Sequence, residues 1–400
     1  MSDGVIPAHP TDVVENVPPP VGDNRQERLP RSRRAAALRD TLIRSVVPVI
    51  LALVAGGVLL LILGTNPLKF YASVWQNGVQ NGSWQDSAML AAPLLLIAVG
   101  LILIFRANIW QLGYDGQYLL AAVLVTGLGP HITGLPSVVF WLVLFLLTAL
   151  VGAIWTLVPA LLKAYYETNE IITTLMMSFV GIDLANILVK GPFQDPTVNI
   201  PQTRTIPSNL MLPSIPGTRV DIGVIVAVIA PFLAYWLLTR TAFGLRLHVL
   251  GANPRAASHV GINVKRLIIN SFLISGAFVG LSAFVDILGV WGYVRSNWNP
   301  AYGDTVIPFV FLARLNPLAV IPFIAFFAIL SNGGDLAAAN TNVPTDFLLV
   351  LVALILLFMT VIEYFGRQRD LGQSYLPPGL KQVFSRPIIP RRRGTREVNS

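Results

Sequence analysis

The sequence predicts an all-α, polytopic membrane protein with about ten transmembrane helices, two of them short. Of its 400 residues, 54% are hydrophobic and only 12% are charged, whereas a soluble globular domain carries about 25% charged residues. Apolar stretches recur along the chain, and most approach the roughly 20 residues that a helix needs to cross a bilayer. The chain between them is too short for a separate soluble catalytic domain, which usually needs about 100 residues.

The apolar segments follow one another with short polar connections. The first, residues 45–64, lies too deep in the chain for a cleaved leader peptide, so we expect it to remain as a helix. Two late segments, residues 305–313 and 318–330, are too short for ordinary spans, and residues 343–362 close the set. The other predicted spans are residues 87–105, 107–129, 136–162, 171–189, 222–238 and 267–285.

Two basic segments flank the predicted transmembrane domain, residues 45–365. Residues 1–44 combine prolines and arginines with little periodicity, which predicts a disordered basic cytoplasmic arm, and residues 366–400 form a basic tail. If all ten segments cross and the N-terminus is inside, 23 Lys and Arg residues are cytoplasmic and 5 are external. The positive-inside rule therefore places both termini in the cytoplasm. The basic ends suit anionic lipid headgroups better than nucleic acid.

The third apolar segment begins with polar residues that cannot face lipid. On a helix, Asn108, Gln111 and Asp115 would share one face, and Gln117 follows. An unpaired aspartate in hydrocarbon costs several kcal/mol, so this face should line a polar path or pair within the protein. The alternative is that Asp115 caps a second half-helix.

The fifth segment carries two polar stripes. Thr174, Ser178 and Gly181 suit close helix packing as well as they suit a path lining, whereas Asp183 is harder to explain by packing. In the seventh segment the spacing of small residues favours packing. The predicted substrate path comprises Asn108, Gln111, Asp115, Gln117, Glu170, Thr174, Ser178, Asp183 and Asn186.

The longest internal loop, residues 240–266, contains its own helix signals. Asn253 is a good N-cap, Pro254 suits the first helical position, and Gly261 suits the position after the end. A helix of about two turns needs a partner or a membrane surface to be stable. The loop is either a handle for a soluble subunit or an interfacial connector. Its candidate contact residues are Gly244, Gly251, Asn253, Pro254, Arg255, Ala256, Ala257 and Gly261.

The external loop, residues 191–221, is rich in proline, so it either receives a binding protein or covers the mouth of the path. Motifs for intrinsic chemistry are missing from the sequence. It has no cysteine, no Gly-Lys dipeptide and no His-Glu-x-x-His motif, which excludes thiolate chemistry, a P-loop and that zinc site. We therefore expect no catalysis, no metal site and no cofactor bound by this chain.

Several motifs together resemble the permease subunits of bacterial ABC importers for simple sugars and nucleosides. The stretch from Asn108 to Gln117 resembles that family's Asn-Ile-Gly-x-(Glu/Asp)-Gly-Gln signature, and residues 169–176 (Asn-Glu-Ile-Ile-Thr-Thr-Leu-Met) resemble its Asn-Glu-Val-Ile-Ser-Thr-Leu-Met run. Residues 241–261 resemble the cytoplasmic region that docks on the ATPase, and residues 313–317 resemble a Gly-Arg-Leu-Asn-Pro turn. The proline-rich stretch from residue 191 is closer to permeases that work with nucleoside-binding lipoproteins of the basic-membrane-protein type.

The resemblance implies a multi-pass permease of the bacterial inner membrane that does not hydrolyse ATP itself. Its implied partners are a cytoplasmic ATPase subunit that holds ATP and magnesium, a second permease subunit, which is a copy or a paralogue, and an external substrate-binding lipoprotein. The expected substrate is a small molecule, a nucleoside, with a ribose-like sugar as the alternative. Two other functional classes remain open. One is a proton-coupled secondary transporter that uses Asp115 or Asp183 as its proton relay, and the other is a membrane scaffold.

Overall fold

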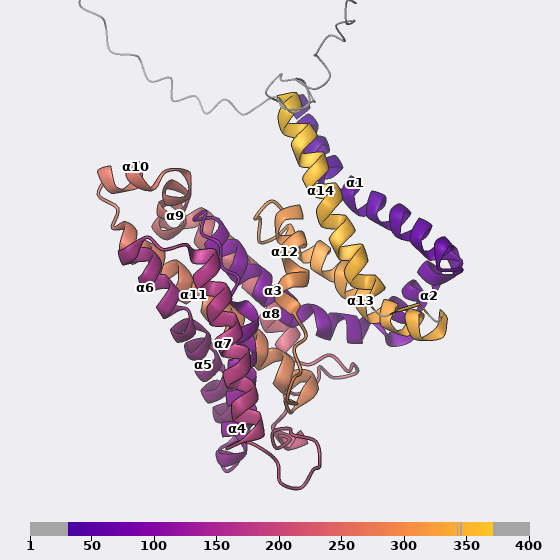
Figure 1. Cartoon of the computed structure of the whole chain (residues 1–400), viewed down its shortest axis with the longest axis vertical. Coiled ribbons are helices and arrows are strands. Elements are labelled where there is room, and N and C mark those ends of the chain that lie inside the picture. Colours follow the sequence, from indigo (N-terminus) through magenta and orange to yellow (C-terminus); the bar gives the residue numbers. More distant parts are fainter. Residues whose placement is uncertain (1–30, 342, 345, 371–400) are drawn as a thin grey trace, which may run out of the picture. The chain divides into compact units, whose positions relative to one another are not determined.

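The structure, a computed structural model, describes residues 31–341, 343–344 and 346–370, and within these residues it is helical, with no strand (Figure 1). The chain divides into two units, Met1–Ile43 and Arg44–Ser400, and the features below belong to the second. Eight helical stretches among the described residues are long and apolar enough to cross a membrane, which confirms the predicted all-α polytopic fold. They are formed by α1 (Arg31–Ile62), α3 (Trp84–Phe105), α5 with α6 (Ser137–Trp155 and Leu157–Tyr166), α7 (Glu170–Lys190), α8 (Gly223–Arg240), α11 with its π-helical end (Val264–Asp286 and Ile287–Trp291), α13 (Val320–Thr341) and α14 (Phe347–Asp370).

Five shorter α-helices complete the part of the chain that the structure describes, and they include the elements that shape the functional regions. Two of them, α2 and α9, are not anticipated by the sequence analysis. The five are α2 (Pro67–Val79), α4 (Tyr114–Leu128), α9 (Ala242–Ala252), α10 (Pro254–His259) and α12 (Tyr302–Leu312).

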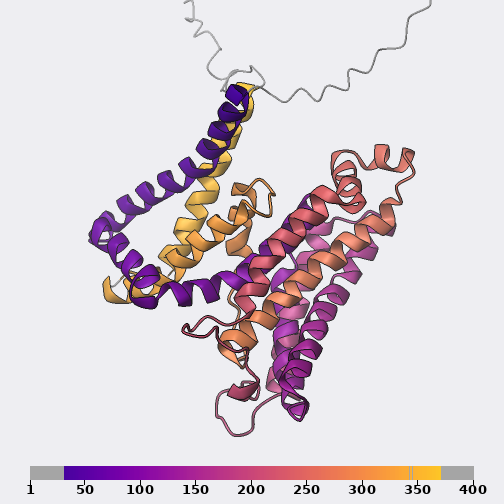
Figure 2. The ribbon, with the colours of Figure 1, turned by 180° about the vertical axis from the view of Figure 1, so that it is seen from behind.

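Helix α3 is the central helix of the Arg44–Ser400 unit, because every residue from Ala91 to Phe105 is buried. Helix α11 packs along α3 and α5 (Figure 2). A Cβ atom on Gly100 would lie 2.8 Å from a backbone oxygen of α11, and Gly152 of α5 meets the backbone at Gly276 and Gly280. The prediction that the small residues of the seventh segment serve helix packing is confirmed.

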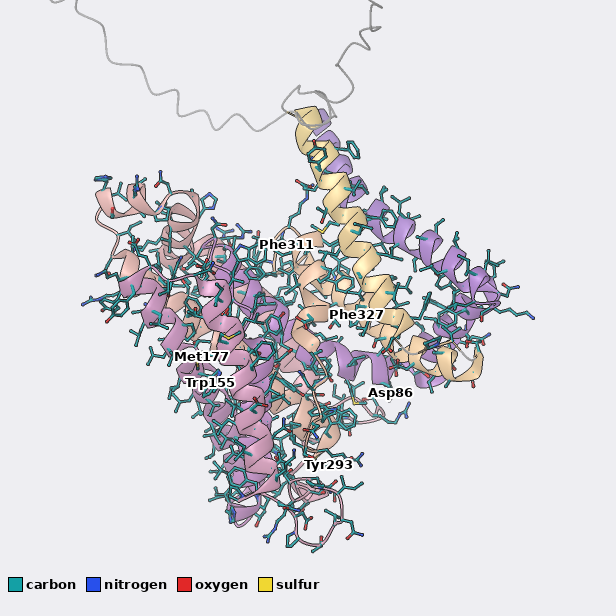
Figure 3. The ribbon with its side chains drawn as sticks, viewed as in Figure 1. Asp86, Trp155, Met177, Tyr293, Phe311 and Phe327 are labelled. Carbon is teal, nitrogen blue, oxygen red and sulfur yellow. The ribbon has the colours of Figure 1, made fainter. Side chains whose placement is uncertain are left out.

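The outer helices expose apolar side chains. Leu146 of α5, Phe179 of α7 and Phe232 of α8 are 58%, 53% and 55% exposed, as expected of surfaces that face lipid or another membrane subunit. The end of α5 is joined to α7 where Trp155 Nε1 donates a hydrogen bond to the Met177 carbonyl oxygen at 3.1 Å (Figure 3).

The third predicted span, residues 107–129, is wrong in its first third. Helix α4 begins only at Tyr114, and Asn108 has a left-handed φ of 56°. Asn108 and Gln111 therefore do not share a helix face with Asp115. The non-helical backbone is tolerated because protein groups satisfy it: the Leu112 amide donates to Thr174 Oγ1 at 3.0 Å, and the Asn108 amide donates to the Phe105 carbonyl oxygen at 2.9 Å.

The two late segments that were predicted to be short, residues 305–313 and 318–330, belong to helices of different length. Helix α12 has 11 residues, which confirms one short element, but α13 has 22 residues and is not short. The helix continues beyond Leu330 because its polar residues find partners: Asn332 Nδ2 donates to the Ser83 carbonyl oxygen at 3.3 Å and to Ser87 Oγ at 3.0 Å. Gly333 also lets α13 approach α2 at Val74. The prediction of two short segments is therefore wrong for the second.

At the two ends of the chain the helices extend further than predicted. Helix α1 begins at Arg31, inside the segment predicted as a disordered arm, and α14 continues to Asp370, inside the predicted tail. The run Arg34-Ala-Ala-Ala-Leu38 consists of good helix formers, which explains the earlier start. The rest of the predicted arm and tail lies outside the described residues.

The loop after α7, residues 191–221, is held by hydrogen bonds to the end of α11 and the segment that follows it. The Thr203 amide donates to the Val294 carbonyl oxygen at 2.9 Å, and the Leu212 amide donates to the Leu288 carbonyl oxygen at 2.8 Å. Burial raises the pKa of the Asp221 carboxyl at the end of the loop, although its Oδ1 accepts a hydrogen bond from the Gly223 amide at 2.7 Å. The loop is therefore fixed to the end of α11.

Candidate functional site

Two helices of the Arg44–Ser400 unit begin beside each other after interrupted stretches of chain. Helix α4 follows the non-helical residues 107–113, and α12 follows residues 292–301, which contain no α-helix. The Tyr114 hydroxyl donates a hydrogen bond to the Asp304 carboxylate, and Asp115 accepts hydrogen bonds from the Asn299 side chain and the Gly303 amide. The two helix starts are therefore joined directly, as expected of paired discontinuous helices beside a transport path.

A buried carboxylate, Asp286 of α11, anchors the same region. It is 2% exposed and accepts hydrogen bonds from Tyr118, Tyr302 and Trp291. The Tyr118 and Tyr302 rings pack edge to face at 5.5 Å. These donors offset the high cost of a buried carboxylate. Asp286 thereby ties α4 to α11 and to the start of α12.

Tyr302 also lines a cavity of about 230 Å³. Phe327 and Leu348, each 6% exposed, and Thr305, 8% exposed, are its buried lining residues, whereas Asp335 and Asp346 are exposed. The walls thus offer hydroxyl and carboxylate groups next to aromatic rings. The residues that line it come from α3, from α12 and the segment before it, from α13, and from the start of α14: Leu90, Pro300, Tyr302, Thr305, Phe327, Ser331, Asp335, Asp346, Leu348 and Leu349.

Five of the predicted path residues come together at the start of α4. Thr174 and Ser178 of α7 receive backbone donors of this segment, the latter from the Gly116 amide at 3.1 Å. Gly181 packs on Gly116. The hydroxyls on this stripe therefore hold α7 against α4 (Figure 1). The five residues are Gln111, Asp115, Gln117, Thr174 and Ser178.

The other four predicted path residues make different contacts or are exposed. Glu170 forms an ion pair with Lys163 at 2.7 Å, and Asn186 Oδ1 accepts a hydrogen bond from the Asn297 amide at 2.6 Å. Asn108 and Asp183 are exposed. None of the nine predicted residues lines the 230 Å³ cavity, and their role in transport stays a prediction.

The sequence analysis missed the polar residues that do line this cavity. Asp335 closes the polar run Ser331-Asn-Gly-Gly-Asp335 within an otherwise apolar stretch. An acidic residue inside a membrane helix is by default a functional candidate, but ending the predicted segment at Leu330 hid it. Asp286, near the end of the seventh apolar segment, was missed although the same signal applied.

The loop between α8 and α11 forms the predicted short helix and one additional helix, α9. Asn253 caps α10 by accepting hydrogen bonds from the Arg255 and Ala256 amides at 3.0 and 3.1 Å, and Gly261 has a φ of +81°, which confirms the predicted helix and both of its boundaries. The stretch from Arg240 to Asn270 has five Lys and Arg residues and no acidic residue.

The predicted contact residues of this loop divide into two groups. Gly244 packs on the backbone at Leu238, Gly251 packs on the carbonyl oxygen of Arg106, and Ala257 is fully buried. Asn253, Pro254, Arg255, Ala256 and Gly261 are accessible. Only the accessible group is available to a partner.

Comparison with known proteins identifies the family. Residues 83–360 match the family described as branched-chain amino acid transport system, permease component. The chain is 32% identical to a glucose ABC transporter permease of Haloferax volcanii, over 81% of this chain and 88% of that protein. It is 25% identical to a guanosine ABC transporter permease of Bacillus subtilis, over 80% of this chain and 92% of that protein.

A galactofuranose transporter permease of Escherichia coli is 29% identical over 58% of this chain and 65% of that protein. No solved structure matches the chain. The resemblance to sugar and nucleoside ABC permeases that the motifs indicate is confirmed. Permeases of this family are multi-pass membrane proteins that associate with an ATPase and a substrate-binding protein. The chain belongs to the family of branched-chain amino acid transport system permease components, and it is a non-catalytic permease subunit of an ABC importer.

Proposed function

We propose that this subunit forms the membrane path for a small, neutral, polyhydroxylated substrate, with a monosaccharide as the first candidate. The observation that carries the proposal is the 230 Å³ cavity with its hydroxyl, carboxylate and aromatic lining. Carboxylates and hydroxyls accept hydrogen bonds from sugar hydroxyls, and the cavity is smaller than the roughly 300 Å³ at the lower end for drug-sized ligands. The similarity to a glucose permease supports this choice.

A nucleoside is the second candidate substrate. The similarity to a guanosine permease over 80% of the chain favours it, as do the motifs, and a nucleoside also carries a hydroxylated ring. The two candidates differ in the base, which needs room and a stacking surface.

The proposed assembly contains a second permease subunit, cytoplasmic ATPase subunits that hold ATP and magnesium, and an external binding lipoprotein. Both termini are cytoplasmic, in a bacterial inner membrane. The uniformly basic loop between Arg240 and Asn270 supports this orientation. Closure of the ATPase dimer then moves α10 and changes which side of the path is open.

Uptake by whole cells tests the substrate. We would compare cells that lack the gene with complemented cells, supply labelled glucose or labelled guanosine, and add unlabelled ribose as a competitor. We expect the deletion to abolish glucose uptake and complementation to restore it. Loss and recovery of guanosine uptake alone would reject the monosaccharide and select the nucleoside.

Replacing Arg255 with glutamate is expected to uncouple transport from ATP hydrolysis. Arg255 is exposed on α10, so the change should leave folding intact while it reverses a charge on the surface proposed to meet the ATPase. We expect uptake to fall about tenfold or more, consistent with the 1.5–3 kcal/mol of a charged hydrogen bond. Gly251 is a poor target, because a side chain there would collide with the Arg106 carbonyl oxygen.

The matched control is Lys69→Glu, which changes an exposed lysine at the start of α2, on the predicted external side. Uptake and substrate-stimulated ATPase activity are measured in reconstituted complexes at equal protein levels. Equal activity of the Arg255→Glu variant and the control would contradict the coupling role.

A further inference from the structure

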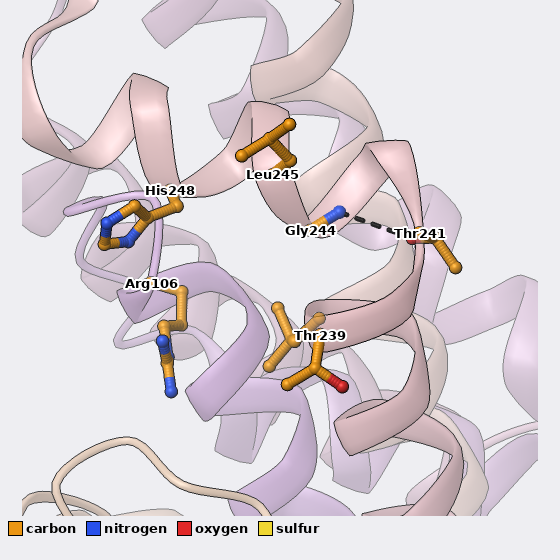
Figure 4. Close-up of a pocket in the computed structure, with 7 residues that line it drawn as sticks. Arg106, Thr239, Thr241, Gly244, Leu245 and His248 are labelled. Atoms are coloured by element: carbon orange, nitrogen blue, oxygen red, sulfur yellow. Dashed lines mark hydrogen bonds between the residues drawn. The ribbon is translucent and has the colours of Figure 1, made fainter. Parts of the chain in front are cut away.

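A polar pocket of about 310 Å³ lies where α3 and α8 end and α9 begins (Figure 4). It is distinct from the 230 Å³ cavity, with which it shares no lining residue. The residues that line it are Arg106, Leu238, Thr239, Thr241, Gly244, Leu245 and His248.

The basic side chains that line the pocket favour a negatively charged ligand. Arg106 Nε donates to the Leu315 carbonyl oxygen at 3.1 Å, which fixes the guanidinium and leaves its terminal N–H groups for a ligand. His248 lies next to Arg106, across the pocket from Thr239 (Figure 4). No acidic residue lines the pocket. A fixed guanidinium matches the geometry of a phosphate group, to which it donates two parallel hydrogen bonds.

The two threonines of the pocket, Thr239 and Thr241, do not donate hydrogen bonds to such a ligand. Thr239 Oγ1 donates to the Tyr235 carbonyl oxygen at 2.7 Å, and Thr241 Oγ1 donates to the Leu237 carbonyl oxygen at 2.5 Å. Their hydroxyl protons are engaged by the helix, so Arg106 supplies the charged donor of the pocket. The pocket therefore selects an anion.

An apolar surface continues from the pocket along α8. Leu245 at the pocket is 66% exposed, and Phe232, Leu233 and Trp236 on α8 are 55%, 55% and 57% exposed. This apolar surface would not stabilise the binding of a free inorganic anion, which has no apolar part. A phospholipid gains from both parts, because its phosphate meets the arginine and its acyl chain covers the apolar face of α8.

We propose that the pocket formed by Arg106, His248 and Leu245 binds the phosphate group of an anionic phospholipid, whose acyl chain lies along α8. Basic pockets between transmembrane helices on the cytoplasmic side are suited to such headgroups. The proposed orientation places this lipid in the inner leaflet. The binding itself does not depend on the orientation or on the transported substrate.

Native mass spectrometry of the full-length subunit tests the proposal. The protein is purified in detergent, incubated with phosphatidylglycerol, and compared with three variants. Arg106→Gln removes the guanidinium. Leu245→Glu keeps Arg106 but puts a carboxylate at the pocket, and because Leu245 is largely exposed, this variant should fold. Arg246→Gln, an exposed arginine that does not line the pocket, is the control.

We expect bound phosphatidylglycerol to fall at least fivefold in Arg106→Gln and in Leu245→Glu and to be unchanged in Arg246→Gln. Equal retention by all three variants would overturn the proposal. Inorganic phosphate at the same concentration is added in a parallel arm. If it displaces the lipid completely, the pocket binds a free anion and the lipid assignment is wrong. Retention by wild type of phosphatidylcholine as well as of phosphatidylglycerol would also overturn it.

Discussion

Replacing Gly116 with valine is expected to abolish uptake and to lower the thermal stability of the purified subunit by several degrees. A Cβ atom at this position would lie 2.6 Å from the Ser178 carbonyl oxygen and 2.8 Å from the Ser178 Cα. From the other helix, a Cβ atom on Gly181 would lie 2.8 Å from the Gly116 Cα. Both contacts involve backbone, so neither helix can yield by rotating a side chain.

The expected cost exceeds that of an ordinary overpacked site, which is typically about 1–3 kcal/mol. Separating α4 from α7 also breaks the hydrogen bond from the Gly116 amide to Ser178 Oγ at 3.1 Å and displaces the adjacent Asp115. Transport should therefore be lost even if some protein still inserts. Gly116→Ala should show an intermediate effect.

Gly134→Val is the matched control, because Gly134 is exposed and a Cβ atom there would have no neighbour within 4 Å. Uptake, membrane level and thermal unfolding in detergent are measured for all three variants. Near-normal uptake and stability of Gly116→Val would show that the described approach of α4 and α7 is wrong.

Replacing Asp335 with leucine is expected to raise the KM for uptake about tenfold or more. Asp335 is an accessible carboxylate of the 230 Å³ cavity, and a hydrogen bond to a charged group contributes about 1.5–3 kcal/mol. The effect should fall mainly on KM, because Asp335 lines the cavity proposed to bind substrate and not the proposed coupling region. Because Asp335 lies on the surface of the cavity, its replacement should leave folding intact.

Asp183→Leu is the matched comparison, since Asp183 is also an exposed aspartate of a membrane helix but does not line the cavity. The cavity account predicts a small effect on KM at this position. A large rise in KM for Asp183→Leu together with a normal KM for Asp335→Leu would place the path along α7, as the sequence suggested, and would reject the cavity.

The fold was largely predictable from the sequence because hydropathy reports directly on the length of a membrane helix. Helix α3 and the start of α10 follow from an apolar run and from the Asn253-Pro254 pair. The predicted span of residues 107–129 began too early, because the groups that satisfy residues 107–113, such as Thr174, are distant in sequence. The length of α13 was missed for the same reason, since Ser83 and Ser87 satisfy Asn332 from another helix.

The candidate site was less predictable than the fold. Spacing along one helix identified Thr174 and Ser178 as partners of a neighbouring helix but could not name that helix. The hydrogen bond between Tyr114 and Asp304 joins residues 190 positions apart, and the hydrogen bond between Tyr118 and Asp286 joins residues 168 positions apart. Such pairs depend on how the two interrupted segments fold back toward each other, which local patterns do not encode.

The most direct test of the account is ATP dependence of uptake in proteoliposomes that contain this subunit, its ATPase and its binding protein. We predict that labelled glucose enters only when hydrolysable ATP is supplied on the ATPase side, and that a protonophore leaves the rate unchanged. Uptake that continues without ATP and collapses with the protonophore would contradict the account and would favour proton coupling through a residue such as Asp115.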